Sequence, residues 1–172
     1  RRIAAEDEYT SHMGAAAAKA ALENAGMKAE EIDFILVATV TPDYPFPSTA
    51  CLIQKELGAK RASGADIQAA CTGFVYALNM AKALVESGTY KNILLIASEK
   101  ISSVTNYKDR STCILFGDGA AACVVSSEGK GLTIEAVKLG ADAEQSDLIV
   151  VPGRGSCQPA TQDSVAKDLH YI

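Results

Sequence analysis

Aromatic residues are scarce in this chain, and one type is missing altogether. The sequence has no tryptophan, and aromatic residues make up only 6% of its 172 residues. A surface on which single-stranded nucleic acid stacks needs several aromatic rings, so this composition argues against that role. The formal net charge of -5 argues against nucleic acid or an anionic membrane as the main partner, while leaving room for local basic spots.

Metal-binding and redox motifs are lacking as well. The chain has five cysteines but no C-x-x-C pair, and only two histidines, His12 and His170. This spacing supports neither a zinc site nor a thioredoxin-type motif, so we expect no metal and no cofactor. Several cysteines lie in apolar runs that do not suit a disulfide framework, which indicates a reducing compartment. Each histidine fits a surface position better than the role of a catalytic base.

Several common sequence motifs are also missing. The chain contains no G-x-G-x-x-G, no Walker A motif and no G-x-S-x-G, which weakens dinucleotide, nucleotide and serine-hydrolase interpretations. No apolar run approaches the length of a membrane span, and no signal peptide precedes Arg1. Because the chain opens without methionine and closes abruptly at Ile172, we expect it to be a piece of a longer protein.

What the sequence does contain is an alternation of strands and helices in a length that fits one domain. Helices are predicted from a cap at Thr10 or Ser11 to Gly26, from a cap at Ser48 or Thr49 to Gly58, and from Cys71 to Gly88. Strands are predicted at 32–40, 65–68, 92–98, 120–125 and 132–139. This order predicts an α/β fold with a mixed, mainly parallel five-stranded sheet and helices on both faces. The last two strands would form an antiparallel pair.

The stretch 64–88 organises the rest of the chain. A short buried strand passes through the bend Ala-Ala-Cys-Thr-Gly into a helix with apolar residues at three- and four-residue intervals. Cys71 therefore lies at a helix N-terminus, where unpaired N–H groups and the helix dipole stabilise a thiolate. Cys71 is the candidate nucleophile. The alternative is a cysteine that fills space in the core like a small apolar residue.

Three segments together resemble a known family. They are TPDYPFPSTACLIQKELG at 41–58, ADIQAACTGFVYAL at 65–78 and DRSTCILFGDGAAACVV at 109–125. In this order and with these gaps, they resemble β-ketoacyl-acyl-carrier-protein synthase III, a condensing enzyme of the thiolase-like superfamily. The A-C-x-G-F and F-G-D-G-A motifs are specific in combination, whereas either alone would be weak.

The resemblance implies a five-layered αβαβα fold built of two similar halves. Residues 1–140 would form most of the N-terminal half without its first strand, and 141–172 would be a substrate-covering loop region that leads to an absent C-terminal half. The resemblance further implies that acetyl-CoA acylates Cys71. Malonyl-acyl-carrier protein would then lose CO₂ and attack the acetyl-cysteine, giving acetoacetyl-acyl-carrier protein.

Three further residues match positions of the family. Phe46 matches a phenylalanine that crosses a homodimer interface to line the partner's acyl pocket, Arg110 an arginine that packs on the CoA adenine, and Phe116 a wall of the acyl pocket. The alternatives are interface or core packing for Phe46, a solvated loop charge for Arg110 and a plain core residue for Phe116. The turn Gly117-Asp118-Gly119 would shape the surroundings of the site.

The chain also departs from the family. The catalytic histidine and asparagine would lie beyond Ile172, and neither His12 nor His170 matches that motif. An arginine and a tryptophan that contact CoA would lie before Arg1. We therefore expect this segment alone to be unable to condense two substrates.

Two alternative functions remain open from the sequence. One is a thiolase-like synthase with another starter, of polyketide or branched-chain type. The other is a non-catalytic partner subunit, against which the presence of Cys71 argues. The expected partners are acyl carrier protein, an acyl-CoA and a second copy of the chain, with no nucleic acid and no membrane. The expected location is the bacterial cytoplasm or the plastid stroma.

Overall fold

The computed structural model describes all residues from 1 to 172. Its helices are α1 (Thr10–Ala25), α2 (Thr49–Leu57), α3 (Gly73–Glu86) and α4 (Gln162–Ala166). Its strands are β1 (Phe34–Ala38), β2 (Ser63–Ile67), β3 (Asn92–Glu99) and β4 (Gly119–Ser126). Short 3₁₀ turns are η1 (Ala29–Glu31), η2 (Ala70–Thr72), η3 (Ile101–Val104) and η4 (Ala143–Gln145).

The strands form one four-stranded sheet in the order β2-β1-β3-β4. β1 is parallel to both of its neighbours, with Leu36 opposite Ala65 of β2 and Leu95 of β3. β4 is antiparallel to β3 and sets Cys123 opposite Leu95. The predicted α/β class and the mixed, mainly parallel sheet are confirmed. The prediction of five strands is wrong, and the antiparallel pair is β3 with β4 rather than β4 with a later strand.

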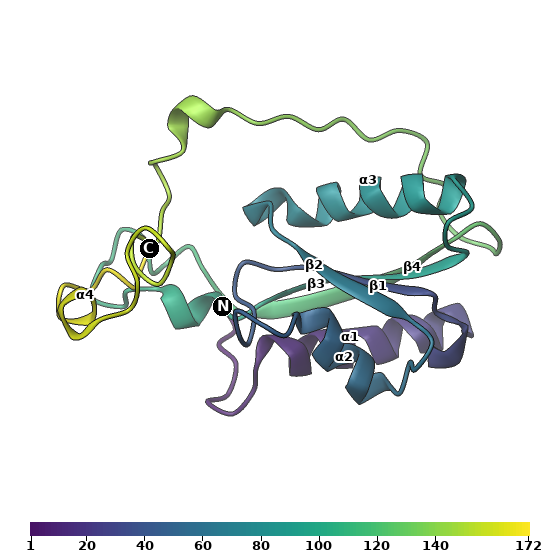
Figure 1. Cartoon of the computed structure of the whole chain (residues 1–172), viewed down its shortest axis with the longest axis horizontal. Coiled ribbons are helices and arrows are strands. Elements are labelled where there is room, and N and C mark those ends of the chain that lie inside the picture. Colours follow the sequence, from purple (N-terminus) through teal and green to yellow (C-terminus); the bar gives the residue numbers. More distant parts are fainter.

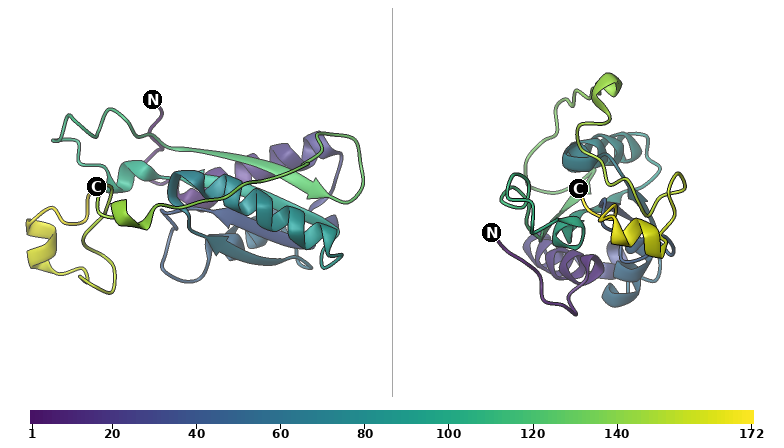
Figure 2. Two further views of the ribbon diagram at one scale, coloured as in Figure 1. Left: turned by 90° about the horizontal axis from the view of Figure 1, so that it is seen from above. Right: turned by 90° about the vertical axis from the view of Figure 1, so that its left-hand side faces the viewer.

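The segment 132–139, predicted as the fifth strand, has no regular structure. After β4 the chain turns toward α3 and runs along that helix instead of returning beside β4 (Figures 1 and 2). Ile134 packs against the apolar cluster beneath α3, and the Tyr76 hydroxyl donates to the Gly140 carbonyl oxygen at 3.1 Å. Apolar residues of this segment such as Ile134 therefore contact the layer of α3 and not a neighbouring strand, whereas Leu132 is fully exposed.

Helices cover both faces of the sheet, as predicted. α1 and α2 lie against one face and α3 against the other (Figure 1). Because side chains alternate along a strand, Ile35 and Val37 of β1 face α1 and α2, whereas Leu36 faces α3. Ala15 and Ala18 of α1 are fully buried, and these small side chains let the helix lie close to the sheet.

The start of α1 differs from the prediction that Thr10 or Ser11 caps it. Tyr9 occupies the cap position, and Thr10 and Ser11 are buried in the first turn. The Thr10 hydroxyl donates to the Thr41 carbonyl oxygen, and the Ser11 hydroxyl donates to the Asp43 carboxylate. These two side chains thus attach α1 to the loop that follows β1, a long-range role that local capping preference does not reveal.

The ends of α2 and α3 follow the predictions. The Ser48 hydroxyl caps α2 by accepting the Cys51 N–H at 3.3 Å. Gly58 ends α2 with φ of +68°, and Gly88 lies just past α3 with φ of +73°. Both glycines adopt the left-handed conformation that closes a helix at little steric cost.

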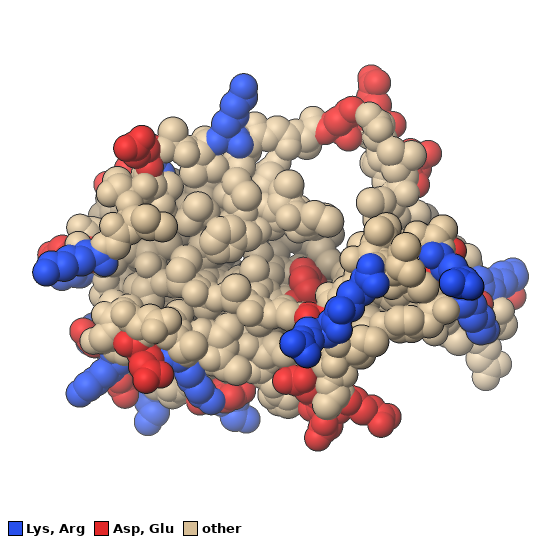
Figure 3. Space-filling view, turned by 180° about the vertical axis from the view of Figure 1, so that it is seen from behind, with Lys and Arg blue, Asp and Glu red and all other residues tan.

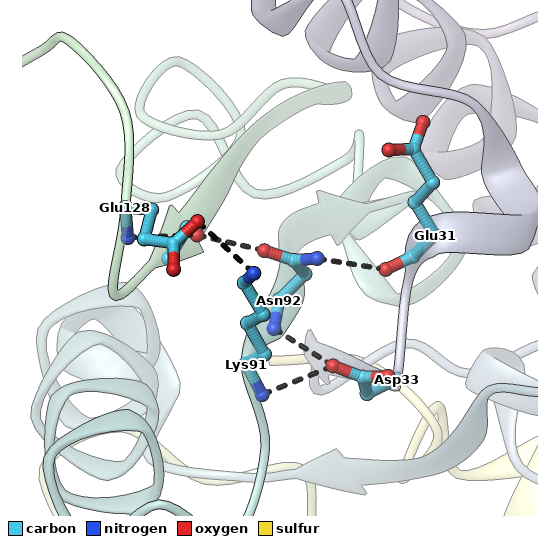
Figure 4. Close-up of polar contacts among 6 residues, drawn as sticks. Glu31, Asp33, Lys91, Asn92 and Glu128 are labelled. Carbon is cyan, nitrogen blue, oxygen red and sulfur yellow. Dashed lines mark hydrogen bonds and ion pairs between the residues drawn. The ribbon is translucent and has the colours of Figure 1, made fainter.

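A polar network ties together the amino ends of β1 and β3 (Figure 4). The Asp33 carboxylate accepts the backbone N–H groups of Lys91 and Asn92, at 3.0 and 2.9 Å. The Asn92 amide donates to the Glu31 carbonyl oxygen, and the Lys91 ammonium pairs with Glu128. The polar side chains at this end of the sheet are therefore engaged in joining strands to turns.

Charged side chains of both signs mix on the surface. On the face shown in Figure 3 they lie mostly along the lower rim and around the C-terminal region, and a broad uncharged area covers the body above. In that C-terminal region the Gly153 N–H donates to the Leu169 carbonyl oxygen, and the Ile172 N–H donates to that of Val104.

None of the helices combines the length and the apolar character that a bilayer crossing requires.

Candidate active site

Cys71 lies in the connection between β2 and α3. β2 ends at Ile67, the turn η2 contains Cys71, and α3 begins at Gly73 with Thr72 as its cap residue. The predicted order of strand, cysteine bend and helix is confirmed, and the cysteine side chain is exposed rather than buried. Within residues 1–172, Cys71 therefore does not fill space in a core.

The backbone of this turn is strained beside the cysteine. Ala70 has φ of +44°, a left-handed conformation that costs a residue with a Cβ roughly 1–2 kcal/mol. The turn is closed from the other side, because the Thr72 N–H and hydroxyl both donate to the Ala69 carbonyl oxygen, at 3.1 and 2.8 Å. Strain that surrounding contacts maintain is frequent at functional sites. A sharp turn of this kind presents the Cys71 side chain outward.

Gly73 brings the start of α3 close to the end of β1. A Cβ at this position would lie 3.2 Å from the Cβ of Ala38, which is closer than ordinary van der Waals contact. The first turn of α3 therefore begins directly over the carboxyl end of the sheet. The positive end of the α3 dipole lies next to Cys71, and the first N–H of the helix, that of Gly73, donates to the Ala70 carbonyl oxygen.

The other cysteines and the two histidines have different surroundings. Burial raises the pKa of the Cys123 thiol on β4, which keeps that group neutral. His12 accepts the Tyr9 N–H through Nδ1 at 3.4 Å, and the His170 ring lies against Tyr171 in a tilted arrangement with 3.9 Å between centroids. Neither imidazole forms a hydrogen bond with Cys71, and the expectation that neither serves as its base stays a prediction.

The sheet topology gathers the predicted site residues at one edge. Phe46 follows the carboxyl end of β1, and Cys71 follows that of the parallel strand β2. Arg110 and Phe116 lie between the carboxyl end of β3 and the start of β4, where Glu99 pairs with Gly119. In open α/β sheets, the carboxyl ends of the strands form the edge where ligands bind.

The loop 41–48, which carries three prolines, is irregular as predicted and has exposed aromatic side chains. Phe46 is 85% exposed, so it lines no pocket within this chain. Between the loop and the end of β2 lies an open hollow of about 570 Å³. Its walls are the backbone and side chains of Thr39, Val40, Pro42, Tyr44, Pro45, Ser48 and Gly64 to Gln68.

Arg110 is exposed and Phe116 is half-buried in the segment that joins β3 to β4. The neighbouring Asp109 side chain accepts hydrogen bonds from Ser111 and Thr112, and these bonds lower the pKa of the Asp109 carboxyl. This turn fixes the backbone beside Arg110. No hydrogen bond joins the Arg110 side chain to Cys71, and the Phe116 ring has no group that could form one. The roles of both residues therefore stay predictions.

Asp118 has a role in this segment that turn chemistry alone does not reveal. Its carboxylate accepts the Ser102 N–H and hydroxyl, at 2.8 and 2.6 Å, and the Ala4 N–H at 2.8 Å. The bend at Gly117 is also close-packed, because a Cβ there would lie 3.1 Å from the Arg2 carbonyl oxygen. Asp118 therefore ties the N-terminal segment and η3 to the bend before β4.

Two carboxylates near the site were missed in the sequence, namely Asp66 on β2 and Glu99 on β3. Asp66 accepts the first backbone N–H groups of α2, and Glu99 accepts three donors at the end of β1. Their partners are far along the chain, so no local motif marks them. For Glu99 the one available signal is an acidic residue directly after a predicted apolar strand, whereas Asp66 lies inside the predicted strand 65–68 and carries no such signal.

Comparison with known proteins identifies close relatives of this arrangement. Residues 65–143, which contain the Cys71 turn, match the family profile of 3-oxoacyl-[acyl-carrier-protein (ACP)] synthase III. The β-ketoacyl-[acyl-carrier-protein] synthase III of Chlamydia caviae is 53% identical over 173 residues, an alignment that covers 100% of this chain and 52% of that protein.

Solved structures agree with the fold. The 3-oxoacyl-(acyl carrier protein) synthase III of Pseudomonas aeruginosa has a TM-score of 0.85 at 32% identity, covering 99% of this chain and 51% of that one. The priming β-ketosynthase from the R1128 polyketide biosynthetic pathway has a TM-score of 0.71 at 46% identity, covering 73% of this chain and 38% of that one.

The fold and the cysteine turn define a thiolase-like α/β protein. Within this class the chain is similar along its whole length to β-ketoacyl-[acyl-carrier-protein] synthase III proteins. It spans about half the length of the curated relatives that it matches.

Proposed function

We propose that this chain carries the nucleophile of a condensing acyltransferase of type II fatty-acid synthesis. The observation that carries the proposal is the exposed Cys71 in a strained turn at the start of α3. The loops with Phe46, Arg110 and Phe116 arise from the same edge of the sheet. Such an edge can bind an acyl thioester beside a thiolate.

In the first proposed step, Cys71 is acylated by acetyl-CoA. The thiolate sulfur attacks the thioester carbonyl carbon, a new S–C bond forms, and the bond to the CoA sulfur breaks. CoA leaves as a thiolate that takes a proton from solvent. We assign the backbone N–H of Cys71 as one donor to the oxyanion, beside the positive end of the α3 dipole. Covalent catalysis of this kind divides one difficult reaction into two easier ones.

In the second proposed step, malonyl-acyl-carrier protein loses CO₂, and the electron pair of the broken C–C bond attacks the acetyl carbonyl carbon. A C–C bond forms, the bond to the Cys71 sulfur breaks, and acetoacetyl-acyl-carrier protein leaves with the thiolate restored. No group in this chain is assigned to assist decarboxylation. We therefore expect purified residues 1–172 to yield no acetoacetyl product, and detection of that product would overturn this expectation.

The proposal also includes substrate contacts and partners. Phe46 is exposed on a loop next to the open hollow at the edge strand β2, which supports a homodimer in which this ring enters the partner's acyl pocket. Arg110 would stack on the CoA adenine and attract its phosphates, and Phe116 would line the acyl pocket. The substrates are an acyl-CoA and acyl carrier protein, without a further cofactor. The bacterial relatives favour the bacterial cytoplasm over the plastid stroma.

A second candidate is a synthase of the same class with another starter unit. Its support is the 46% identity to a priming β-ketosynthase of a polyketide pathway. The two candidates differ in the acyl group that Cys71 accepts. A non-catalytic partner subunit is disfavoured, because the chain has Cys71 in an exposed, strained turn.

The test is the acylation of Cys71 in the full-length protein. The protein is incubated with acetyl-CoA, branched acyl-CoAs and longer acyl-CoAs, and the peptide that contains residue 71 is analysed by mass spectrometry. Fast acetylation supports fatty-acid synthesis, and preference for another acyl group supports the second candidate. Cys71→Ala should abolish labelling and condensation. Unchanged condensation in that variant would favour the non-catalytic interpretation of this cysteine.

A further inference from the structure

We propose that Glu99 is a positioning residue of the acyl-transfer site, an inference that rests on the proposed function of Cys71. Glu99 is the last residue of β3 and is partly buried. It forms no hydrogen bond with Cys71 or with the predicted substrate-binding residues. Its carboxylate instead fixes the backbone segment 39–41, through which both sides of the site are connected.

The carboxylate of Glu99 accepts three hydrogen bonds at the end of β1. Oε1 accepts the Val40 N–H at 2.8 Å. Oε2 accepts the Thr41 hydroxyl at 2.6 Å and the Thr39 hydroxyl at 3.3 Å. Thr39 and Thr41 are both buried, so these hydroxyls depend on protein partners rather than on water.

The partners around this carboxylate explain why a side chain that only accepts hydrogen bonds suits the position. The Thr41 hydroxyl oxygen accepts the Lys100 N–H at 2.8 Å, and the Thr39 hydroxyl oxygen accepts the Thr41 N–H at 3.1 Å. Both hydroxyls therefore turn their own protons to Glu99, which must act only as an acceptor. The Lys100 ammonium binds backbone carbonyl groups of residues 5, 6 and 8, so neutral donors alone hold the Glu99 carboxylate.

One connection leads from Glu99 to the Cys71 turn. The Thr39 N–H donates to the Ile67 carbonyl oxygen at 3.1 Å, and Ile67 is the last residue of β2 before the turn. On the other side of the turn, Gly73 packs against Ala38, the residue before Thr39. A shift of Thr39 would therefore move the chain on both sides of Cys71.

A second connection leads from Glu99 to the loop with Phe46. Glu99 binds Thr41 at the base of this loop, and the Thr41 carbonyl oxygen accepts the Thr10 hydroxyl from α1. Asp43, two residues further, is held by Ser11. Glu99 thus couples the position of the nucleophile to that of the loop predicted to limit the acyl chain.

The test compares Glu99→Gln and Glu99→Asp in the full-length protein. Gln keeps the size of the side chain but places an NH₂ group against hydroxyl donors, whereas Asp keeps a carboxylate on a shorter stem. The rate of Cys71 acylation is measured by mass spectrometry with acetyl-CoA and with a longer acyl-CoA. Because small displacements of a reacting group cost large factors in rate, we expect Glu99→Gln to slow acetylation by about tenfold or more.

The ratio of the two acylation rates separates positioning from a merely structural role. A variant that only reduces the folded fraction slows both acyl-CoAs equally. A displaced loop and turn should change the ratio by about threefold or more, and Glu99→Asp should restore part of it. Glu23→Gln, at an exposed glutamate of α1, is the matched control and should behave as the unmodified protein.

Each outcome has a separate meaning. An unchanged rate and ratio in Glu99→Gln, or equal slowing of both acyl-CoAs, would overturn the inference and leave the proposed function standing. If Glu99→Gln does not fold, the rate ratio of Glu99→Asp decides in the same way. Absence of acylation in the unmodified protein would instead refute the proposed function of Cys71.

Discussion

The Asp66 carboxylate on β2 lies 2.6 Å from the backbone nitrogen of Thr49, the first residue of α2. The same carboxylate accepts the Ala50 N–H at 2.8 Å. A residue of the edge strand thus neutralises the positive end of a helix that belongs to a different part of the chain. This contact joins the strand that leads to Cys71 to the layer of helices on the opposite face from α3.

The first prediction concerns this contact. Asp66→Asn keeps the shape of the side chain but removes its charge and one acceptor oxygen. We expect the free energy of unfolding of the full-length protein to fall by about 1–2 kcal/mol. Urea denaturation measures the loss, and Asp7→Asn at an exposed aspartate is the control. Equal unfolding midpoints in the two variants would show that the Asp66 contact contributes nothing.

The second prediction concerns the approach of α3 to β1. Gly73→Ala introduces a Cβ at 3.2 Å from that of Ala38, so the start of α3 must move by a few tenths of an ångström. We expect Cys71 to be acylated several-fold more slowly, since its turn ends at this glycine. Gly131→Ala, where a Cβ has open space, is the control. An unchanged acylation rate in Gly73→Ala would mean that the close packing does not set the position of the cysteine.

The third prediction concerns the strained residue before Cys71. Ala70→Gly relieves the left-handed strain but adds freedom to the unfolded chain, so we expect a change within about 1 kcal/mol. Ala70→Val places a β-branched side chain at positive φ and should lower the free energy of unfolding by roughly 1–2 kcal/mol. Denaturant unfolding of both variants provides the measurement. A valine variant as stable as the glycine variant would contradict the strained backbone.

The fourth prediction concerns the buried thiol of Cys123. Burial raises the pKa of this thiol in the folded state, so folding opposes its ionisation. The resulting stabilisation is complete below the pKa of the unfolded thiol, about 8.5, and is lost as pH rises through the folded value. We expect the urea midpoint of the unmodified protein to fall more between about pH 7 and pH 10 than that of Cys123→Ala.

The control for this prediction is Cys157→Ala, which removes an exposed thiol. That variant should keep the alkaline loss of the unmodified protein. If Cys123→Ala and the unmodified protein lose stability in parallel as pH rises, the thiol of Cys123 does not contribute to the alkaline transition.

Local sequence signals were sufficient for much of the site. The change from a short strand to helical periodicity places Cys71 between β2 and α3, and the helix ends at Ser48, Gly58 and Gly88 depend on neighbours within a few residues. These features are predictable because the residues that cause them are close in the chain. The same reasoning explains why the irregular loop with three prolines was predicted correctly.

Long-range contacts account for what the sequence did not reveal. Asp66 binds residues 16 and 17 positions away, and Glu99 binds residues 58 to 60 positions away. The prediction of a strand at 132–139 is wrong for a related reason. Alternation of apolar residues indicates that one side of a segment is covered, but it does not tell whether a strand or the helix α3 provides the cover.

The antiparallel course of β4 has a consequence for how relatives of this protein can diversify. Glu99 ends β3 opposite Gly119 at the start of β4. The residues between these two therefore leave the sheet and return to it at the same end. Insertions or deletions within 105–117 would leave the ladder of the two strands intact. The exposed part of this segment around Arg110 can therefore vary in length without rebuilding the interior of the sheet.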